Sequence, residues 1–87
     1  MEVSVWDTYV DRNDGKQMHF DIIVPSSITD IATVLNYGHA FLSTKPFQTK
    51  NLTSSECRYC HIEQATEAMT SAIAAQGFYI LEMENCD

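Results

Sequence analysis

The chain has 87 residues, of which 45% are hydrophobic and 20% charged, a balance typical of one globular domain rather than of a disordered segment. Twelve acidic residues against five basic ones give a net charge of −7. A nucleic-acid binder needs basic surface to displace phosphate counterions, and an anionic membrane also attracts basic surface. We therefore expect a single domain over residues 1–87 with neither nucleic acid nor membrane as its partner.

The first seven residues, Met1 to Asp7, do not combine a basic segment with a following apolar one, as a secretory signal would. No apolar run approaches the roughly 18 residues of a membrane-spanning helix. These two observations predict a cytoplasmic protein, in which Cys57, Cys60 and Cys86 are free thiols or ligands. The odd number of cysteines excludes a complete set of intramolecular disulfides.

A β-hairpin is predicted at the start of the chain. Residues 3–10 are rich in strand-forming side chains, and the Asp14-Gly15 pair is a strong turn signal. Residues 17–24 alternate, which places one apolar set on a single face: Met18, Phe20, Ile22 and Val24. A loop with an even number of residues adds Val3, Val5, Asp7 and Tyr9 to that face, and an odd loop adds Trp6 and Thr8 instead. The even register is predicted because it places more apolar surface on one face, although it also places the charged Asp7 there.

Two helices follow the hairpin. Pro25 ends the second strand, and the spacing of Ser27 and Asp30 predicts an N-cap at Ser27, or at Ser26, for a helix that runs to about Thr44. Gly38 inside this helix suggests a close approach to the sheet. A second helix is predicted over residues 66–76, between an N-cap at Thr66 and a C-terminal glycine, Gly77.

The remaining strands complete the fold. A strand is expected over residues 57–62, because a loop of some 20 residues without any strand is uncommon in a compact domain. Residues 78–84 are expected to form the last strand. Apolar side chains fall on both of its faces at the start, which is typical of a central strand. The order ββαβαβ predicts a two-layer α+β domain with both helices packed on one face of a small mixed sheet.

Four segments carry a resemblance to a known family. They are Val5-Trp6-Asp7-Thr8-Tyr9-Val10, Met18-His19-Phe20-Asp21, Cys57-Arg58-Tyr59-Cys60-His61, and Gly77-Phe78-Tyr79-Ile80-Leu81-Glu82-Met83-Glu84. Together they resemble a family of short bacterial proteins catalogued only as a domain of unknown function. The resemblance spans nearly the whole chain and implies a small cytoplasmic α+β fold, but it brings no activity, ligand or catalytic residue. One local departure is Thr66-Glu67 at the start of the second helix, where the family pattern has Ser-Pro.

The segment Cys57-x-x-Cys60-His61 is the sharpest chemical pattern in the sequence. It matches the haem attachment motif of c-type cytochromes, yet the chain lacks an export signal and an evident haem pocket. Zinc is a second interpretation, with Cys57, Cys60, either His61 or His39, and Cys86 as ligands. A redox dithiol is a third.

A plain strand is the leading interpretation of the same segment. Alternation then sends Cys57, Tyr59 and His61 to one face and Cys60 to the other. Two thiols on opposite faces neither chelate one ion nor form a disulfide easily. No cofactor is therefore expected, with zinc as the alternative.

Trp6, His19 and Asp21 form a second candidate surface, because the even register places them together on the face opposite the main core. A histidine beside a carboxylate can serve acid–base chemistry, but a half-exposed sheet face commonly carries such a pair as well. No activated nucleophile or phosphate-binding loop accompanies these residues. The structural interpretation is the favoured one, and Asp7 is likewise expected to be a hydrogen-bonded structural residue.

The favoured function is a non-enzymatic interaction module that binds a protein partner or a second copy of itself. Free sheet edges pair readily, and twofold dimers are the commonest oligomers. The alternative is a metal-binding or thiol-redox protein centred on Cys57, Cys60 and His61. A hydrolase-like site at His19 and Asp21 is the third hypothesis.

Overall fold

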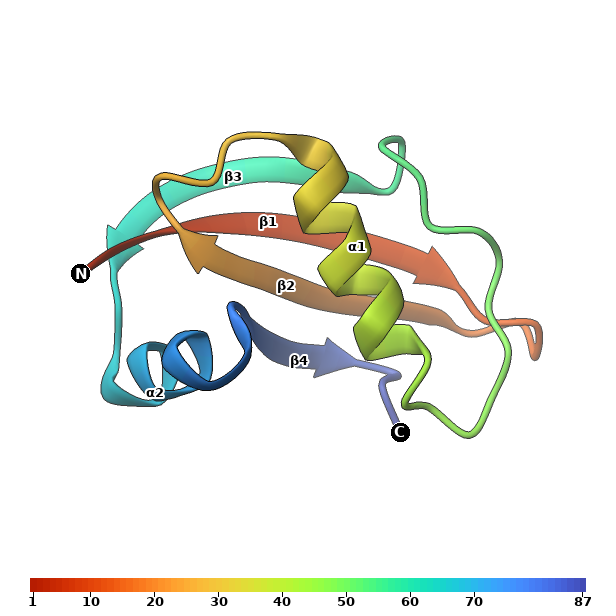
Figure 1. Cartoon of the computed structure of the whole chain (residues 1–87). Helices are drawn as coiled ribbons and strands as arrows, with labels where there is room; N and C mark the ends of the chain where they lie inside the picture. Colours follow the sequence, from red (N-terminus) through yellow and green to blue (C-terminus); the bar gives the residue numbers. More distant parts are fainter.

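The computed structural model describes residues 1–87. Its elements in chain order are β1 (Glu2–Asp11), β2 (Gln17–Pro25), α1 (Ile31–Leu42), β3 (Cys57–Gln64), α2 (Glu67–Gln76) and β4 (Tyr79–Glu84). The strands form one sheet in the order β3-β1-β2-β4 (Figure 1). The predicted α+β class and the ββαβαβ order are confirmed. The sheet is antiparallel throughout and is not mixed, because each edge strand runs opposite to the hairpin strand it pairs with.

The hairpin register is the odd one. Asp11 pairs with Gln17, which leaves residues 12–16 as the turn, and Gly15 adopts the positive φ of +93° that the turn requires. The Asp14 carboxylate accepts hydrogen bonds from the Lys16 backbone N–H and from Arg12, and so holds this turn length. The predicted even register is therefore wrong, and Trp6 lies opposite Ile22. Hydrogen bonds within the turn fix an odd number of turn residues, whereas apolar surface area alone predicted an even number.

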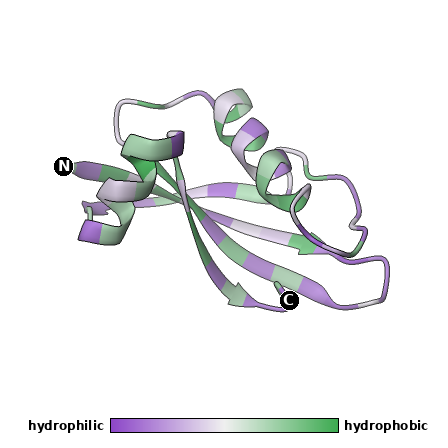
Figure 2. Cartoon of the chain, turned by 60° about the horizontal axis from the view of Figure 1, so that its bottom comes forward, coloured by the Kyte–Doolittle hydropathy of each residue, from purple (hydrophilic) through white to green (hydrophobic).

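Helix α1 covers the face of the sheet that carries the larger core (Figures 1 and 2). Its N-cap is Asp30, whose carboxylate accepts a hydrogen bond from the Thr33 backbone N–H. The predicted cap at Ser27 is wrong, because residues 26 and 27 make a turn instead, closed by the Ile28 N–H on the Pro25 carbonyl. The buried α1 residues Val34 and Phe41 join a cluster built on the inward residues of the hairpin: Trp6, Val10, Met18, Phe20, Ile22 and Val24.

Helix α2 lies at the end of the sheet where β4 begins (Figure 1). Thr66 accepts from the Met69 N–H as the N-cap, and Gly77 ends the helix at φ +94°, both as predicted. Met69 packs in a second cluster with Val3, Val5 and Ile23. Val3, Val5 and Ile23 alternate along their strands with the residues beneath α1, so the two helices contact opposite faces of the sheet. The prediction that both helices pack on one face is wrong. The odd register leaves this apolar patch on the far side, where only α2 covers it.

The strands β3 and β4 form the two edges of the sheet. The strand predicted at 57–62 is confirmed as β3, whereas the expected central position of the last strand is wrong. The double-sided apolar character at the start of β4 has another cause. Phe78 and Ile80 contact the core under α1, while Tyr79 contacts the cluster under α2.

Candidate functional site

The face of the sheet opposite α1 is divided into two halves. The half near α2 is apolar and covered, as described above. The other half carries Asp7 and Tyr9 from β1 with His19 and Asp21 from β2. Asp7 lies directly opposite Asp21, and Tyr9 directly opposite His19. Because directly opposite residues in an antiparallel ladder point to the same face, these four side chains form one polar surface.

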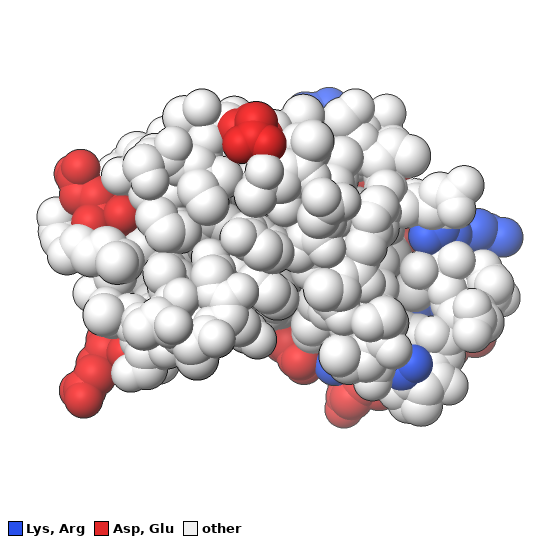
Figure 3. Space-filling view, in the orientation of Figure 1, with Lys and Arg blue, Asp and Glu red and all other residues white.

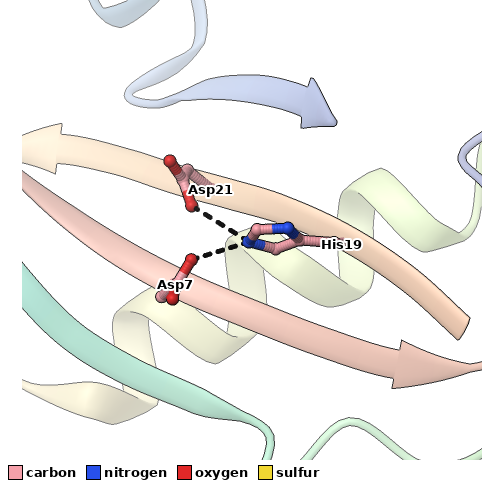
Figure 4. Close-up of side chains that lie close together, drawn as sticks. All are labelled: Asp7, His19 and Asp21. Carbon is pink, nitrogen blue, oxygen red and sulfur yellow. Dashed lines mark hydrogen bonds and ion pairs between the residues drawn. The ribbon is translucent and has the colours of Figure 1, made fainter. Parts of the chain in front are cut away.

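Three of these side chains converge on one point (Figure 4). His19 Nε2 lies 2.8 Å from Asp7 Oδ1 and 4.0 Å from Asp21 Oδ1. The Asp21 Oδ1 atom is buried and has no hydrogen-bond partner. One ligand atom from each of the three residues falls within 4.8 Å of the other two. We refer to Asp7, His19 and Asp21 as the carboxylate–histidine cluster.

The two carboxylates of the cluster have different electrostatic environments. The hydrogen bond to His19 holds the pKa of Asp7 below its usual value. Burial, together with the adjoining Asp7 carboxylate, raises the pKa of Asp21 to about 6. The exposed fraction of the side chain is 38% for Asp7 but 13% for Asp21. Asp21, the less solvated of the two carboxylates, therefore holds its negative charge less readily than Asp7 does.

The imidazole of His19 is held in place by its surroundings. The Tyr9 ring stacks on it with centroids 4.1 Å apart and an interplanar angle of 10°. At the backbone, the Cys86 thiol lies 3.6 Å from the His19 carbonyl oxygen, to which it donates. Stacking on one side and the Asp7 hydrogen bond at Nε2 together fix the ring orientation.

A polar hollow of about 560 Å³ borders the cluster. Asp7 and Tyr9 line it from β1, Arg58 lines it from β3, and Lys50 and Glu56 line it from the segment between α1 and β3. Since Asp7 belongs to both the hollow and the cluster, the hollow gives the cluster access from solvent.

Trp6 does not belong to this surface. It lies on the α1 side, is only 8% exposed, and meets Tyr59 in an edge-to-face contact with ring centroids 5.7 Å apart. The predicted grouping of Trp6 with His19 and Asp21 is therefore wrong, because it depended on the even register. His19 and Asp21 do lie together, with Asp7 in the place that was assigned to Trp6.

The structure does not bring Cys57, Cys60 and His61 together as one set of ligands. Cys57 is 3% exposed on the α1 side, where the Thr8 hydroxyl donates to its sulfur, and burial raises the pKa of its thiol. Cys60 is the extra residue of a β-bulge and is exposed. His61 pairs with Val5 on the opposite face, with its Nδ1 3.1 Å from the Cys60 sulfur. The bulge therefore separates Cys57 from His61, which simple alternation had placed on one face.

The family model for a domain of unknown function, DUF2024, matches residues 1–83. The chain belongs to this family. Protein NE1680 from Nitrosomonas europaea, a structural genomics target solved by NMR, is 36% identical over the full length of both chains and superposes with a TM-score of 0.85. No curated protein matches the chain. Neither helix is long and apolar enough to span a membrane.

Sequence reasoning missed Asp7 and Tyr9 as members of the polar surface of this DUF2024 protein. One signal was available. A carboxylate among apolar partners is costly, so the position that Asp7 takes in the even register argued for the odd one. The hydrogen bonds within the five-residue turn fix its odd length and so the register of the hairpin. They are not visible as a sequence pattern.

Proposed function

We propose that the protein is a non-enzymatic binding module that holds a transition-metal ion, with Zn²⁺ as the first candidate, in the carboxylate–histidine cluster. One observation carries the proposal. Two carboxylates lie directly opposite each other in the hairpin and converge with an imidazole nitrogen, while one buried oxygen, Asp21 Oδ1, has no partner. A cation supplies that partner and neutralises the like charges.

The ligand chemistry supports a transition metal rather than Ca²⁺ or Mg²⁺. An imidazole nitrogen with two carboxylates suits Zn²⁺ and its neighbours, whereas the two hard cations prefer oxygen ligands alone. Ligands of a tetrahedral zinc ion lie about 3.4 Å apart. The distances from His19 Nε2, 2.8 Å to Asp7 and 4.0 Å to Asp21, bracket that spacing. The neighbouring hollow leaves room for water as a fourth ligand.

Calorimetric titration of the purified protein with Zn²⁺, Mn²⁺ and Ca²⁺ tests the proposal. We expect one Zn²⁺ per chain, with weaker Mn²⁺ and no measurable Ca²⁺ binding. His19→Ala and Asp21→Asn should each weaken Zn²⁺ binding at least tenfold, since loss of even an outer-shell partner of a metal ligand costs that much.

His61→Ala is the matched control, because His61 forms a second histidine–carboxylate pair outside the cluster, with Nε2 3.2 Å from Glu63 Oε2. It should leave Zn²⁺ affinity unchanged. Equal Zn²⁺ affinity in the wild type and His19→Ala would refute the site, as would loss of binding in His61→Ala alone. The predicted cytoplasmic location fits a module of this kind and stays a prediction.

A further inference from the structure

The edge strand β3 has an exposed outer edge and contributes no residue to the carboxylate–histidine cluster. Seven of its eight residues are exposed, and its outer side pairs with no other strand. Tyr59 and Ile62 are 51% and 42% exposed although both are large apolar side chains. Arg58 makes no ion pair within the chain, whereas Arg12 and Lys45 do. A long exposed edge of this composition can add a further strand.

We propose that the partner is a second copy of the chain, which pairs β3 with β3 in antiparallel fashion across a twofold axis between Cys60 and His61. In this register Arg58 faces Glu63 of the second copy, and Tyr59 faces Ile62. The twofold repeats both pairs. The two ion pairs and the two apolar pairs therefore arise from the same eight-residue strand.

The β-bulge makes this register compatible with the faces of the sheet. Tyr59 pairs with Trp6 and Ile62 with Ser4, so both point to the α1 side. Arg58 and Glu63 pair with Asp7 and Val3 and point to the opposite side. A regular strand would send residues an odd number of positions apart to different faces. Because Cys60 is an extra residue in β3, Tyr59 and Ile62 point to the same face although they lie three positions apart. Each of these side chains therefore lies opposite a side chain of the second copy on the same face of the sheet.

The backbone hydrogen bonds agree with the same register. The Ala65 N–H donates to Met1, and the Tyr9 N–H to the Glu56 carbonyl, so residues 65 and 56 point toward β1. Alternation from these two ends turns the free N–H and C=O groups of Tyr59 and Ile62 outward. Tyr59 and Ile62 thus form a hydrogen-bonded pair across the axis.

Charge complementarity favours this register over its neighbours. Shifting the axis by one residue in either direction keeps the face parity but places Arg58 opposite His61 or Ala65, so that the ion pairs with Glu63 are lost. The net charge of −7 on each copy opposes association at long range, but that repulsion is screened beyond about 8 Å in physiological salt. On the face of Figure 3, acidic groups are scattered and do not form one patch. The local pairs at β3 therefore decide the contact.

Sedimentation equilibrium of the whole chain over a wide concentration range tests the dimer. Wild-type protein should show a concentration-dependent monomer–dimer equilibrium. Arg58→Glu and Glu63→Arg should each raise the dissociation constant at least tenfold, because each places like charges opposite one another. An equimolar mixture of the two variants should form a heterodimer, and the double variant R58E/E63R should regain the homodimer.

Two matched controls carry the same changes in net charge away from β3. Glu84→Arg lies on the other edge strand and Lys16→Glu in the hairpin turn, and neither should alter the dissociation constant. A wild type that stays monomeric at every concentration would overturn the proposal. A dimer that resists both reversals at β3, or that Glu84→Arg abolishes, would overturn it as well. None of the reversed β3 residues belongs to the carboxylate–histidine cluster, so Zn²⁺ binding and dimerisation of the wild type are measured separately and either proposal can fail alone.

Discussion

Asp7 and Asp21 lie directly opposite each other on the polar face of the β1–β2 hairpin. Like charges in this arrangement destabilise a sheet, whereas opposite charges or apolar pairs stabilise it. The neighbouring His19 hydrogen-bonds to Asp7 and leaves Asp21 Oδ1 without a partner. The pair of like charges therefore lowers the stability of the hairpin at this position. Such local destabilisation is common at functional sites.

Replacing Asp21 with Asn should raise the free energy of unfolding at pH 7. The folded-state pKa of Asp21 is about 6, above its unfolded value of 3.8. The folded protein therefore binds this proton more tightly, and stability from this group falls as pH rises from about 4 to 6. Asparagine removes the charge and can donate to Asp7. We expect a gain of about 1 kcal/mol, set below the full linkage value because solvent screens the carboxyl.

Urea denaturation of Asp21→Asn and wild type at pH 4 and pH 7 measures this effect. The difference in unfolding free energy should be present at pH 7 and absent at pH 4, where Asp21 is protonated. An equal difference at both pH values would show that the effect has no link to this titration. A loss of stability at pH 7 would contradict the assigned environment of Asp21.

Only one of the three thiols should react in the native protein. Cys60 is exposed, while Cys57 and Cys86 are buried and burial raises the pKa of both thiols. Because the thiolate is the reactive species, alkylation should label Cys60 alone in buffer and all three cysteines in denaturant. Intact-mass spectrometry counts the labels. Two rapidly labelled thiols without denaturant would show that the second is accessible and would revive a dithiol function.

Gly38→Ala should destabilise the protein although alanine favours a helix by about 1 kcal/mol. An added Cβ would lie 2.5 Å from Leu52 Cδ2 and 3.0 Å from Ile22 Cδ1. Overpacking of this kind typically costs 1–3 kcal/mol, so we expect a net loss of about 1 kcal/mol in chemical denaturation. Asn36→Ala, at an exposed position of the same helix, is the control and should be neutral or stabilising. A more stable Gly38→Ala would mean that Leu52 moves aside freely.

Arg12→Lys should loosen the C-terminal segment. The Arg12 guanidinium donates to the Asn85 and Asp87 carbonyls and stacks 3.7 Å over the Phe47 ring. Lysine keeps the charge but cannot reproduce a planar fork with several donors. We expect a loss of about 1–2 kcal/mol in unfolding free energy and faster amide exchange at Cys86. Lys45→Arg is the control, and unchanged exchange at Cys86 would contradict the role assigned to Arg12.

The sequence by itself determined the class and order of the elements, because alternation, caps and turn residues act over a few positions. The strand at 57–62, the Thr66 cap and the C-terminal Gly77 required no distant partner to be predicted. The close packing expected at Gly38 also followed, since only a special contact justifies glycine inside a helix.

Tertiary structure alone decided which residues share a face. A change of one residue in the β1–β2 turn moves every side chain of a strand to the other face, and side-chain hydrogen bonds of Asp14 hold that turn at its length. The bulge at Cys60 acts in the same way on β3. The cluster of Asp7, His19 and Asp21 therefore follows from the odd length of the β1–β2 turn, and the separation of Cys57 from His61 follows from the bulge, and neither is visible as a motif along the chain.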